Sequence, residues 1–192
     1  MSQDRIILVR HGRPALSRDV KLTWRGYRDW WRQYDEGGLT EEQTIPEEVK
    51  RLAGESDIFI SSPLRRAVET ATLLRAHGPD LIDDDLVEAA LPPPHLGPLK
   101  FSPRAWGVWA RVVWFVGFSD GLESHSAARV RAMRMAKKLA EQASGGKTVL
   151  VTAHGWYNRM LKVRLKRLGW DCISENGDLH WNHRILVKDT KE

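Results

Sequence analysis

Two patterns of apolar and polar positions take turns along this chain: short apolar runs, which predict strands, and segments with helical periodicity, which predict helices. Compact apolar runs typical of buried strands occupy residues 6–9, 57–62 and 147–154. A weaker strand-like piece lies within 81–88, and we interpret 183–188 as an edge strand at the C-terminal end of the chain. Helical periodicity fills residues 46–52, 63–76, 127–143 and 156–168. This order predicts the α/β class, as a three-layer α/β/α sandwich with a mostly parallel central sheet.

Capping and turn residues support several of these helices. Pro46 suits a first helical position, and Ser62 is the expected N-cap of the helix that starts at Pro63. Gly78 ends that helix, and Gly169 ends the helix over 156–168.

Two regions do not fit the alternating scheme. Residues 13–45 are polar and contain tryptophans, and residues 89–122 begin with three prolines and continue into a Trp-rich segment. We expect both to be loops or an insertion over the active face. A length of 192 residues suits one α/β domain with an insertion, so we treat residues 1–192 as one domain.

Composition narrows the class of protein. The chain has 192 residues, of which 42% are hydrophobic and 29% charged, as in globular proteins, and its net charge of +5 favours an anionic substrate. The one cysteine, Cys172, excludes an intramolecular disulfide and a Cys-cluster metal site. The N-terminus lacks the apolar core of a signal peptide, and no stretch reaches the ~18–20 apolar residues of a membrane span. We therefore expect a soluble cytoplasmic protein.

Three predicted strands end in polar residues that suit one reaction. The first ends at Arg10-His11-Gly12, the second leads through two serines to Arg65 and Arg66, and the run over 147–154 ends at His154. Ligands of parallel sheets bind outside the carboxyl ends of the strands, so these groups are expected to meet in one crevice. Arginines hold the charge of a phosphoryl group, and an unprotonated imidazole can attack phosphorus. Glu88 is a candidate carboxyl group for protonating the leaving oxygen.

Three motifs carry a resemblance to a known family. Arg10-His11-Gly12, the stretch over 62–71 (SPLRRAVETA) and the stretch over 151–155 (VTAHG) resemble the histidine phosphatase superfamily, the phosphoglycerate-mutase-like enzymes. The resemblance implies that His11 is the nucleophile that becomes phosphorylated. It also implies that Arg10, Arg66 and His154 bind the phosphoryl group and that Glu88 is the proton donor.

The residues after the first motif depart from the mutases of that family. Mutases tend to carry a Thr or Ser and an Asn shortly after the triplet, where this chain has Arg13-Pro14-Ala15. The departure favours a phosphatase with a different pocket, with Gly12 close beside the phosphate and Arg13 as a further substrate contact. A phosphomutase and a non-catalytic protein that binds phosphorylated ligands remain the alternatives.

Each site residue also has a structural alternative. Either histidine can be a satisfied structural group, Arg66 can pair with Glu69 on a helix surface, and Glu88 or Arg13 can be solvated. Metal binding is disfavoured because arginines accompany His11 and His154, and no further ligand set accompanies the close pair His180 and His183. We expect no cofactor. The basic residues are dispersed and form no nucleic-acid motif, so the expected partner is a small-molecule or protein phosphoester.

The aromatic residues of the Trp-rich segment leave several interpretations open. Trp106, Trp109 and Phe115 have roughly helical spacing, which favours core packing. The alternatives are an aromatic lid over the phosphate site, with His95 at its mouth, or a membrane-surface patch flanked by Arg104 and Arg111. The remaining tryptophans of interest, Trp24, Trp30 and Trp31, suit an opposing wall or a homodimer contact.

Overall fold

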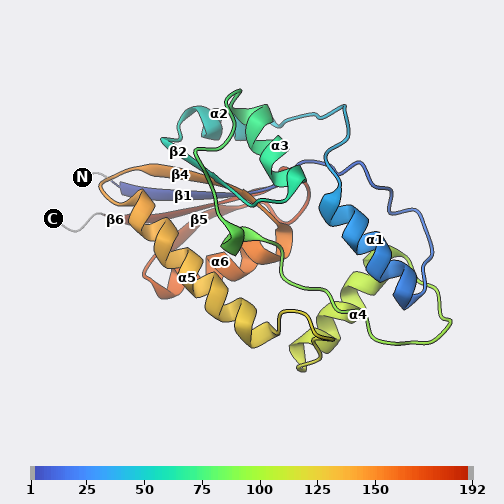
Figure 1. Ribbon diagram of the computed structural model, residues 1–192. Coiled ribbons are helices and arrows are strands. Elements are labelled where there is room, and N and C mark those ends of the chain that lie inside the picture. The colour runs from blue at the N-terminus through green and yellow to red at the C-terminus, as the bar shows by residue number, and fades with distance from the viewer. Residues whose placement is uncertain (1–2, 190–192) are drawn as a thin grey trace.

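The computed structural model describes residues 3–189 and contains one six-stranded sheet (Figure 1). The strands lie in the order β3 (Leu81–Ile82), β2 (Ile58–Ser61), β4 (Thr148–Ala153), β1 (Gln3–Arg10), β6 (His183–Asp189) and β5 (Asp171–Glu175). The first four are mutually parallel, whereas β6 pairs antiparallel with both β1 and β5. The mostly parallel sheet that the sequence predicted is confirmed.

Two strand predictions were wrong in detail. The strand over 183–188 is not an edge strand, because β6 lies between β1 and the unforeseen edge strand β5. In the 81–88 region only Leu81 and Ile82 form a strand, and Leu86 belongs to the 3-10 helix η1 (Asp84–Leu86).

Helices cover both faces of the sheet, which confirms the three layers. α2 (Glu47–Gly54) and α3 (Arg65–Leu74) lie on one side, and α5 (His125–Ala143) and α6 (Gly155–Arg167) on the other (Figure 1). The N-cap of α3 is Leu64, not Ser62 as predicted. None of the helices within residues 3–189 is long and apolar enough to cross a membrane.

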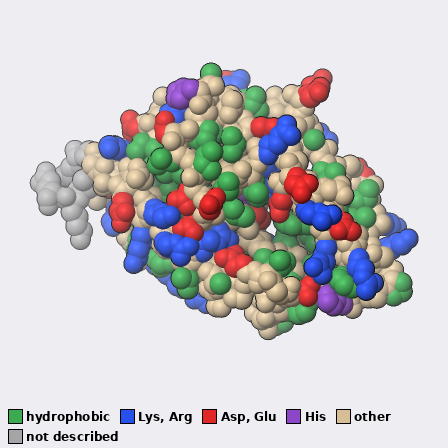
Figure 2. All heavy atoms as spheres, in the orientation of Figure 1, with side chains coloured by type: hydrophobic (Ala, Val, Ile, Leu, Met, Phe, Trp, Pro, Cys, Tyr) green, Lys and Arg blue, Asp and Glu red, His purple; other side chains and the backbone are tan. Residues whose placement is uncertain are grey.

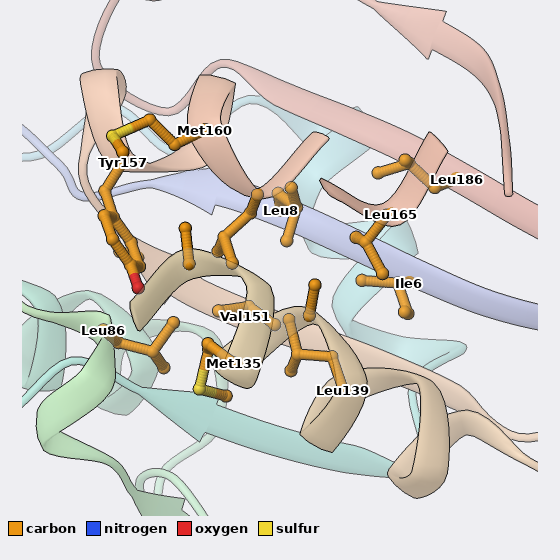
Figure 3. Packing of buried hydrophobic residues seen from close by; sticks show 14 of the residues in the cluster. Ile6, Leu8, Leu86, Met135, Leu139, Val151, Tyr157, Met160, Leu165 and Leu186 are labelled. Atoms are coloured by element: carbon orange, nitrogen blue, oxygen red, sulfur yellow. The ribbon is translucent and has the colours of Figure 1, made fainter. Parts of the chain in front are cut away.

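The alternation of side chains along β1 divides the core between the two faces. Ile6 and Leu8 point toward α5 and α6, where they pack among residues such as Leu139 and Leu165 (Figure 3). The intervening Ile7 and Val9 pack on the opposite face against α2 and α3. Because successive strand side chains face opposite ways, one apolar run supplies both cores.

The two regions expected to be loops each contain a helix of 13 residues, α1 (Trp24–Glu36) and α4 (Pro103–Phe115). The helices lie together at the end of the molecule opposite the chain termini (Figure 1). An aromatic cluster joins them, in which Tyr27, Trp30 and Tyr34 of α1 pack with Trp106 of α4. Of the two alternatives for these regions, loops or an insertion, the loop alternative was therefore wrong for the helical parts.

The prediction that the aromatic residues of the Trp-rich segment pack in the core is confirmed for only some of them. Trp106 and Trp114 are fully buried, whereas Trp109 and Phe115 are about half exposed. The buried face of α4 thus follows Trp106, Ala110 and Trp114, at spacings of four residues.

Candidate active site

The register of the parallel strands brings the predicted polar groups to one edge of the sheet. Arg10 at the end of β1 aligns with Ala153 at the end of β4, and Ser61 of β2 aligns with Thr152. The ladder continues one step further, since the His11 amide donates to the Ala153 carbonyl at 3.0 Å. His11, Ser62 and His154 therefore leave adjacent strand ends together.

His11 and His154 face each other across this edge. Both side chains are buried, and their ring centroids are 5.3 Å apart. Nδ1 of His11 lies 2.8 Å from the carbonyl oxygen of Gly12. A carbonyl can only accept, so Nδ1 carries the proton of the neutral ring and Nε2 keeps its lone pair. This tautomer leaves Nε2 as a nucleophile.

Hydrogen bonds also define the tautomer of His154. Nδ1 of this ring lies 3.4 Å from Nη2 of Arg66, which can only donate, so Nδ1 is the acceptor. Nε2 then carries the proton and donates to the Ser62 hydroxyl at 2.8 Å. Ser62, predicted as a helix cap, instead orients this imidazole.

The site keeps both imidazoles uncharged. Burial, followed by the neighbouring His154, Arg66 and Arg10, holds the pKa of His11 well below its usual value. Burial and the same two arginines hold the pKa of His154 well below its usual value as well. An imidazole must be unprotonated to attack phosphorus, so the charges around His11 favour its reactive form.

Arg66 is buried in the site, and the alternative of a surface ion pair with Glu69 is wrong. It donates to the Tyr34 carbonyl at 2.8 Å and to Asp35 at 3.0 Å, and its guanidinium lies over the Tyr34 ring. The exposed Arg65 pairs with Glu69 instead, at 2.7 Å. The partners of Arg66 come from the last turn of α1, so α1 fixes the position of this guanidinium.

Arg10 lies against the first residue of α6. A Cβ placed on Gly155 would meet the Arg10 guanidinium carbon at 3.4 Å, so glycine allows this close approach. Nη1 of Arg10 donates to the Asp178 carbonyl. Its Nε is buried without a hydrogen-bond partner among the described residues. Arg10 therefore retains donor capacity for a ligand.

Glu88 lies against the N-terminus of α6, the helix that begins directly after His154. Oε1 accepts hydrogen bonds from the amides of Ala89 at 2.9 Å and Tyr157 at 3.0 Å, whereas Oε2 has only a longer contact, 3.4 Å, with the Trp156 amide. Glu88 is half-buried and lines a cavity together with Arg10. The solvated-carboxylate alternative therefore does not describe its surroundings.

Gly12 and Arg13 differ in how closely they are packed. A Cβ on Gly12 would lie 2.7 Å from both Gln43 Oε1 and Trp181 Cζ2, so this position has no room for a side chain. The Arg13 backbone is fixed by a pair of hydrogen bonds with the Gln43 amide, but its side chain is exposed. Arg13 lines a separate, smaller cavity with Arg18, Arg104 and His180.

His180 is a third imidazole in this region, and the sequence analysis missed its position. Its ring centroid is 5.6 Å from that of His11, and Nε2 is buried without a partner among the described residues. Burial and the nearby arginines, Arg10 first, lower the pKa of His180 to about 4. Its location follows from the β5–β6 hairpin, which was not predicted.

Arg10 and Glu88, two of the predicted site residues, line a cavity of about 750 Å³. Its walls come largely from α1 and α4, and they include Trp30, Trp31 and Phe115. His95 is elsewhere: it stacks on Trp24 with ring centroids 4.0 Å apart. Trp30 and Trp31 thus form part of the expected opposing wall, whereas the predictions that Trp24 belongs to that wall and that His95 lines the mouth were wrong.

These features define a protein of the histidine phosphatase type, and the comparisons agree. The model of the histidine phosphatase superfamily (branch 1) matches residues 6–176, and the chain belongs to this superfamily. A comparison with curated proteins gave no match.

Solved structures share the fold at low sequence identity. Mycobacterial hydrolase 1 is 20% identical with a TM-score of 0.57, over 86% of this chain and 82% of that protein. TTHB049 from Thermus thermophilus is 25% identical with a TM-score of 0.50, over 81% of each chain. Phosphoserine phosphatase from Entamoeba histolytica, in complex with 3-phosphoglyceric acid, is 17% identical with a TM-score of 0.52, over 85% and 80%.

Proposed function

We propose that this protein is a metal-independent phosphatase that hydrolyses a phosphomonoester through a phosphohistidine intermediate on His11. The observation that carries the proposal is the state of His11: a buried, uncharged imidazole with Nδ1 bound to the Gly12 carbonyl and Nε2 free beside Arg66 and Arg10. A structural histidine has no need of two neighbouring guanidinium groups.

In the first step, Nε2 of His11 attacks phosphorus in line, so that a P–N bond forms as the bond from phosphorus to the leaving oxygen breaks. Arg10 and Arg66 stabilise the charge on the non-bridging oxygens, and His154 lies beside them as the second imidazole of the site. Glu88 gives its proton to the leaving oxygen. Oε2 is the oxygen suited to carry that proton, because Oε1 already accepts two shorter amide hydrogen bonds.

In the second step, water attacks the phosphorus of phospho-His11 and the P–N bond breaks. The Glu88 carboxylate takes a proton from the attacking water, inorganic phosphate leaves, and both His11 and Glu88 return to their starting states. The alcohol product departs before this step, which is what distinguishes hydrolysis from a mutase reaction.

A panel of phosphomonoesters assayed with excess EDTA tests the function. We expect release of inorganic phosphate in stoichiometric amounts with the alcohol, at a rate that EDTA does not change. Isomerised phosphoester in place of free phosphate would identify a mutase. Tight phosphate binding with no turnover of any ester would identify a non-catalytic binding protein.

A further inference from the structure

The cavity beside Arg10 and Glu88 has aromatic walls on several sides. Its aromatic lining consists of Tyr27, Trp30 and Trp31 of α1, Phe115 of α4 and Trp156 of α6. Several of these rings also serve the fold, since Tyr27 and Trp30 belong to the buried cluster between α1 and α4. Phe115 packs edge-on against His125 and Trp156, yet it is 48% exposed although it is a large apolar side chain.

The same cavity carries more positive than negative charge. Five arginines line it (Arg10, Arg18, Arg104, Arg111 and Arg159), against two acids, Glu88 and Asp178. Asp178 is already engaged, because it pairs with Arg159 and Arg184. On the face that carries α5, by contrast, Lys and Arg gather beside Asp and Glu (Figure 2), and Arg134 and Lys138 pair with Asp85.

Arg111 is one of these cations, and it lies against two tryptophan rings. Its guanidinium carbon lies 4.8 Å from the centroid of the Trp114 ring and 4.6 Å from that of Trp156. Its hydrogen bond to the Ala90 carbonyl is long, at 3.4 Å, and it forms no ion pair with a described residue. Burial lowers the pKa of Arg111 to about 10, so it still carries its charge at neutral pH. The Trp rings therefore hold a fixed cation at the cavity wall.

Two residues of the cavity lining carry a buried polar atom with no hydrogen-bond partner among the described residues. The Tyr27 hydroxyl and the Trp156 Nε1–H are buried and make no hydrogen bond within the described part of the chain. Tyr27 has no exposed surface, and burial raises the pKa of its hydroxyl, which stays protonated. Buried polar groups are normally satisfied, and both of these residues line the cavity.

We propose that this cavity binds the leaving group of the substrate, and that this leaving group is a planar ring that carries a second acidic group paired with Arg111. The inference rests on the proposed phosphatase function and names its substrate class. Flat rings match the aromatic walls, and the acidic group supplies an ion-pair partner, which Arg111 does not have among the described residues.

Four alkyl phosphates with closely similar leaving oxygens test both halves of the proposal. Benzyl and cyclohexylmethyl phosphate differ in flatness, and 4-carboxybenzyl and 4-carbamoylbenzyl phosphate differ in charge at nearly equal shape. We expect the wild-type protein to give a higher kcat/KM for benzyl than for cyclohexylmethyl phosphate. We also expect kcat/KM to be about tenfold or more higher for 4-carboxybenzyl than for 4-carbamoylbenzyl phosphate, because a charge-assisted hydrogen bond is worth about that factor.

The Arg111→Gln variant tests the assigned cation. It should bring the carboxylate-to-amide ratio of kcat/KM close to one, because the amide gains as much from a neutral partner as the carboxylate does. Arg129→Gln is the matched control, since Arg129 is an exposed arginine that lines a different groove on α5. This control should keep the wild-type ratio.

The outcomes separate this inference from the proposed function. Equal kcat/KM for all four esters in the wild-type protein would overturn the inference and leave the phosphatase function standing. A carboxylate preference that persists in Arg111→Gln would overturn the role of Arg111. No turnover of any of the four, with no phosphoenzyme, would overturn both. The wild-type comparison needs no variant, so it decides the substrate class even where Arg111→Gln fails to fold.

Discussion

Asp35 at the end of α1 forms an ion pair with Arg66 of the candidate active site, with Oδ1 of Asp35 3.0 Å from Nη2 of Arg66. The two side chains differ in exposure, at 1% for Arg66 and 33% for Asp35. Arg66 belongs to the sequence motif of the family, whereas Asp35 comes from a segment outside all three motifs. The pair shows that α1 contributes to the geometry of the candidate active site as well as to the aromatic wall of the cavity.

We expect Asp35→Asn to lower both stability and activity. Removing the carboxylate leaves the buried Arg66 charge with neutral partners, at a cost of about 1–3 kcal/mol once the partial exposure of Asp35 is allowed for. The looser guanidinium should lower kcat/KM by roughly tenfold or more. Urea denaturation and steady-state kinetics measure the two effects.

Asp29→Asn on the same helix is the control for that prediction. Asp29 forms an exposed pair with Arg32, so its loss should change stability by no more than about 0.5 kcal/mol and leave kcat/KM unchanged. Equal effects of the two substitutions would show that Asp35 has no special relation to Arg66.

Gly12→Ala should destabilise the protein by about 1–3 kcal/mol, because the new methyl group overlaps the Trp181 ring and the Gln43 side chain. Gly54→Ala is the matched control, since nothing lies within 4 Å of a Cβ at that position. It should be neutral or stabilising by up to about 1 kcal/mol. Thermal and urea unfolding of both variants provide the measurement, and equal stabilities would disprove the crowding at Gly12.

Glu88→Gln should lower kcat/KM most for substrates whose leaving oxygen must be protonated as it departs. Glutamine keeps an acceptor oxygen for the Tyr157 amide but cannot deliver a proton. We expect kcat/KM for benzyl phosphate to fall by about 10²–10⁴-fold, and that for 4-nitrophenyl phosphate, whose leaving group departs as a stable anion, to fall much less.

Glu141→Gln, an exposed carboxylate on α5, serves as the control for the Glu88 substitution and should leave both rates unchanged. A uniform loss for both esters in Glu88→Gln would mean that Glu88 positions the site and does not donate the proton.

Stability should fall as the pH drops from about 6.5 to 5. In the folded protein the pKa values of His11 and His154 lie well below 6.5, and that of His180 is about 4, whereas the unfolded chain titrates near 6.5. In this window the unfolded state binds more protons, so lower pH favours unfolding, by at most about 1.4 kcal/mol per pH unit for each histidine.

His180→Gln should make that pH dependence shallower. Urea denaturation at pH 5, 6 and 7 gives the slope for the wild type and the variant. Carboxylates with lowered pKa values, such as Asp85 at about 2, act below this range, so they do not obscure the comparison. An unchanged slope in the variant would show that His180 is equally protonated in both states.

The parts of the fold that sequence predicted well share a strong local signal. The runs that became β1, β2 and β4 are almost wholly apolar because both faces of these strands are covered, and they led directly to His11 and His154. The edge strand β5 has alternating exposure and only five residues, so its pattern does not stand out from a loop.

The parts of the site that the sequence did not predict, the partners of Arg66 and the position of His180, belong to elements that were not predicted. Tyr27, Trp30 and Tyr34 recur at spacings of three and four residues, a helical period that identifies α1, but the polar residues around them resemble a loop. Because α1 was not predicted, its residues Tyr34 and Asp35 could not be identified as partners of Arg66. Without β5, nothing indicates that the β5–β6 hairpin brings His180 to within 5.6 Å of His11, measured between ring centroids.

The most direct test of the mechanism is a rapid-quench experiment with ³²P-labelled benzyl phosphate, followed by peptide mapping. We predict a phosphoenzyme that is labile in acid and stable in base, with the label on the peptide that contains His11, and no label in His11→Ala. A labelled phosphoenzyme that persists in His11→Ala, or turnover in that variant at the wild-type rate, would contradict the assignment of His11 as the nucleophile.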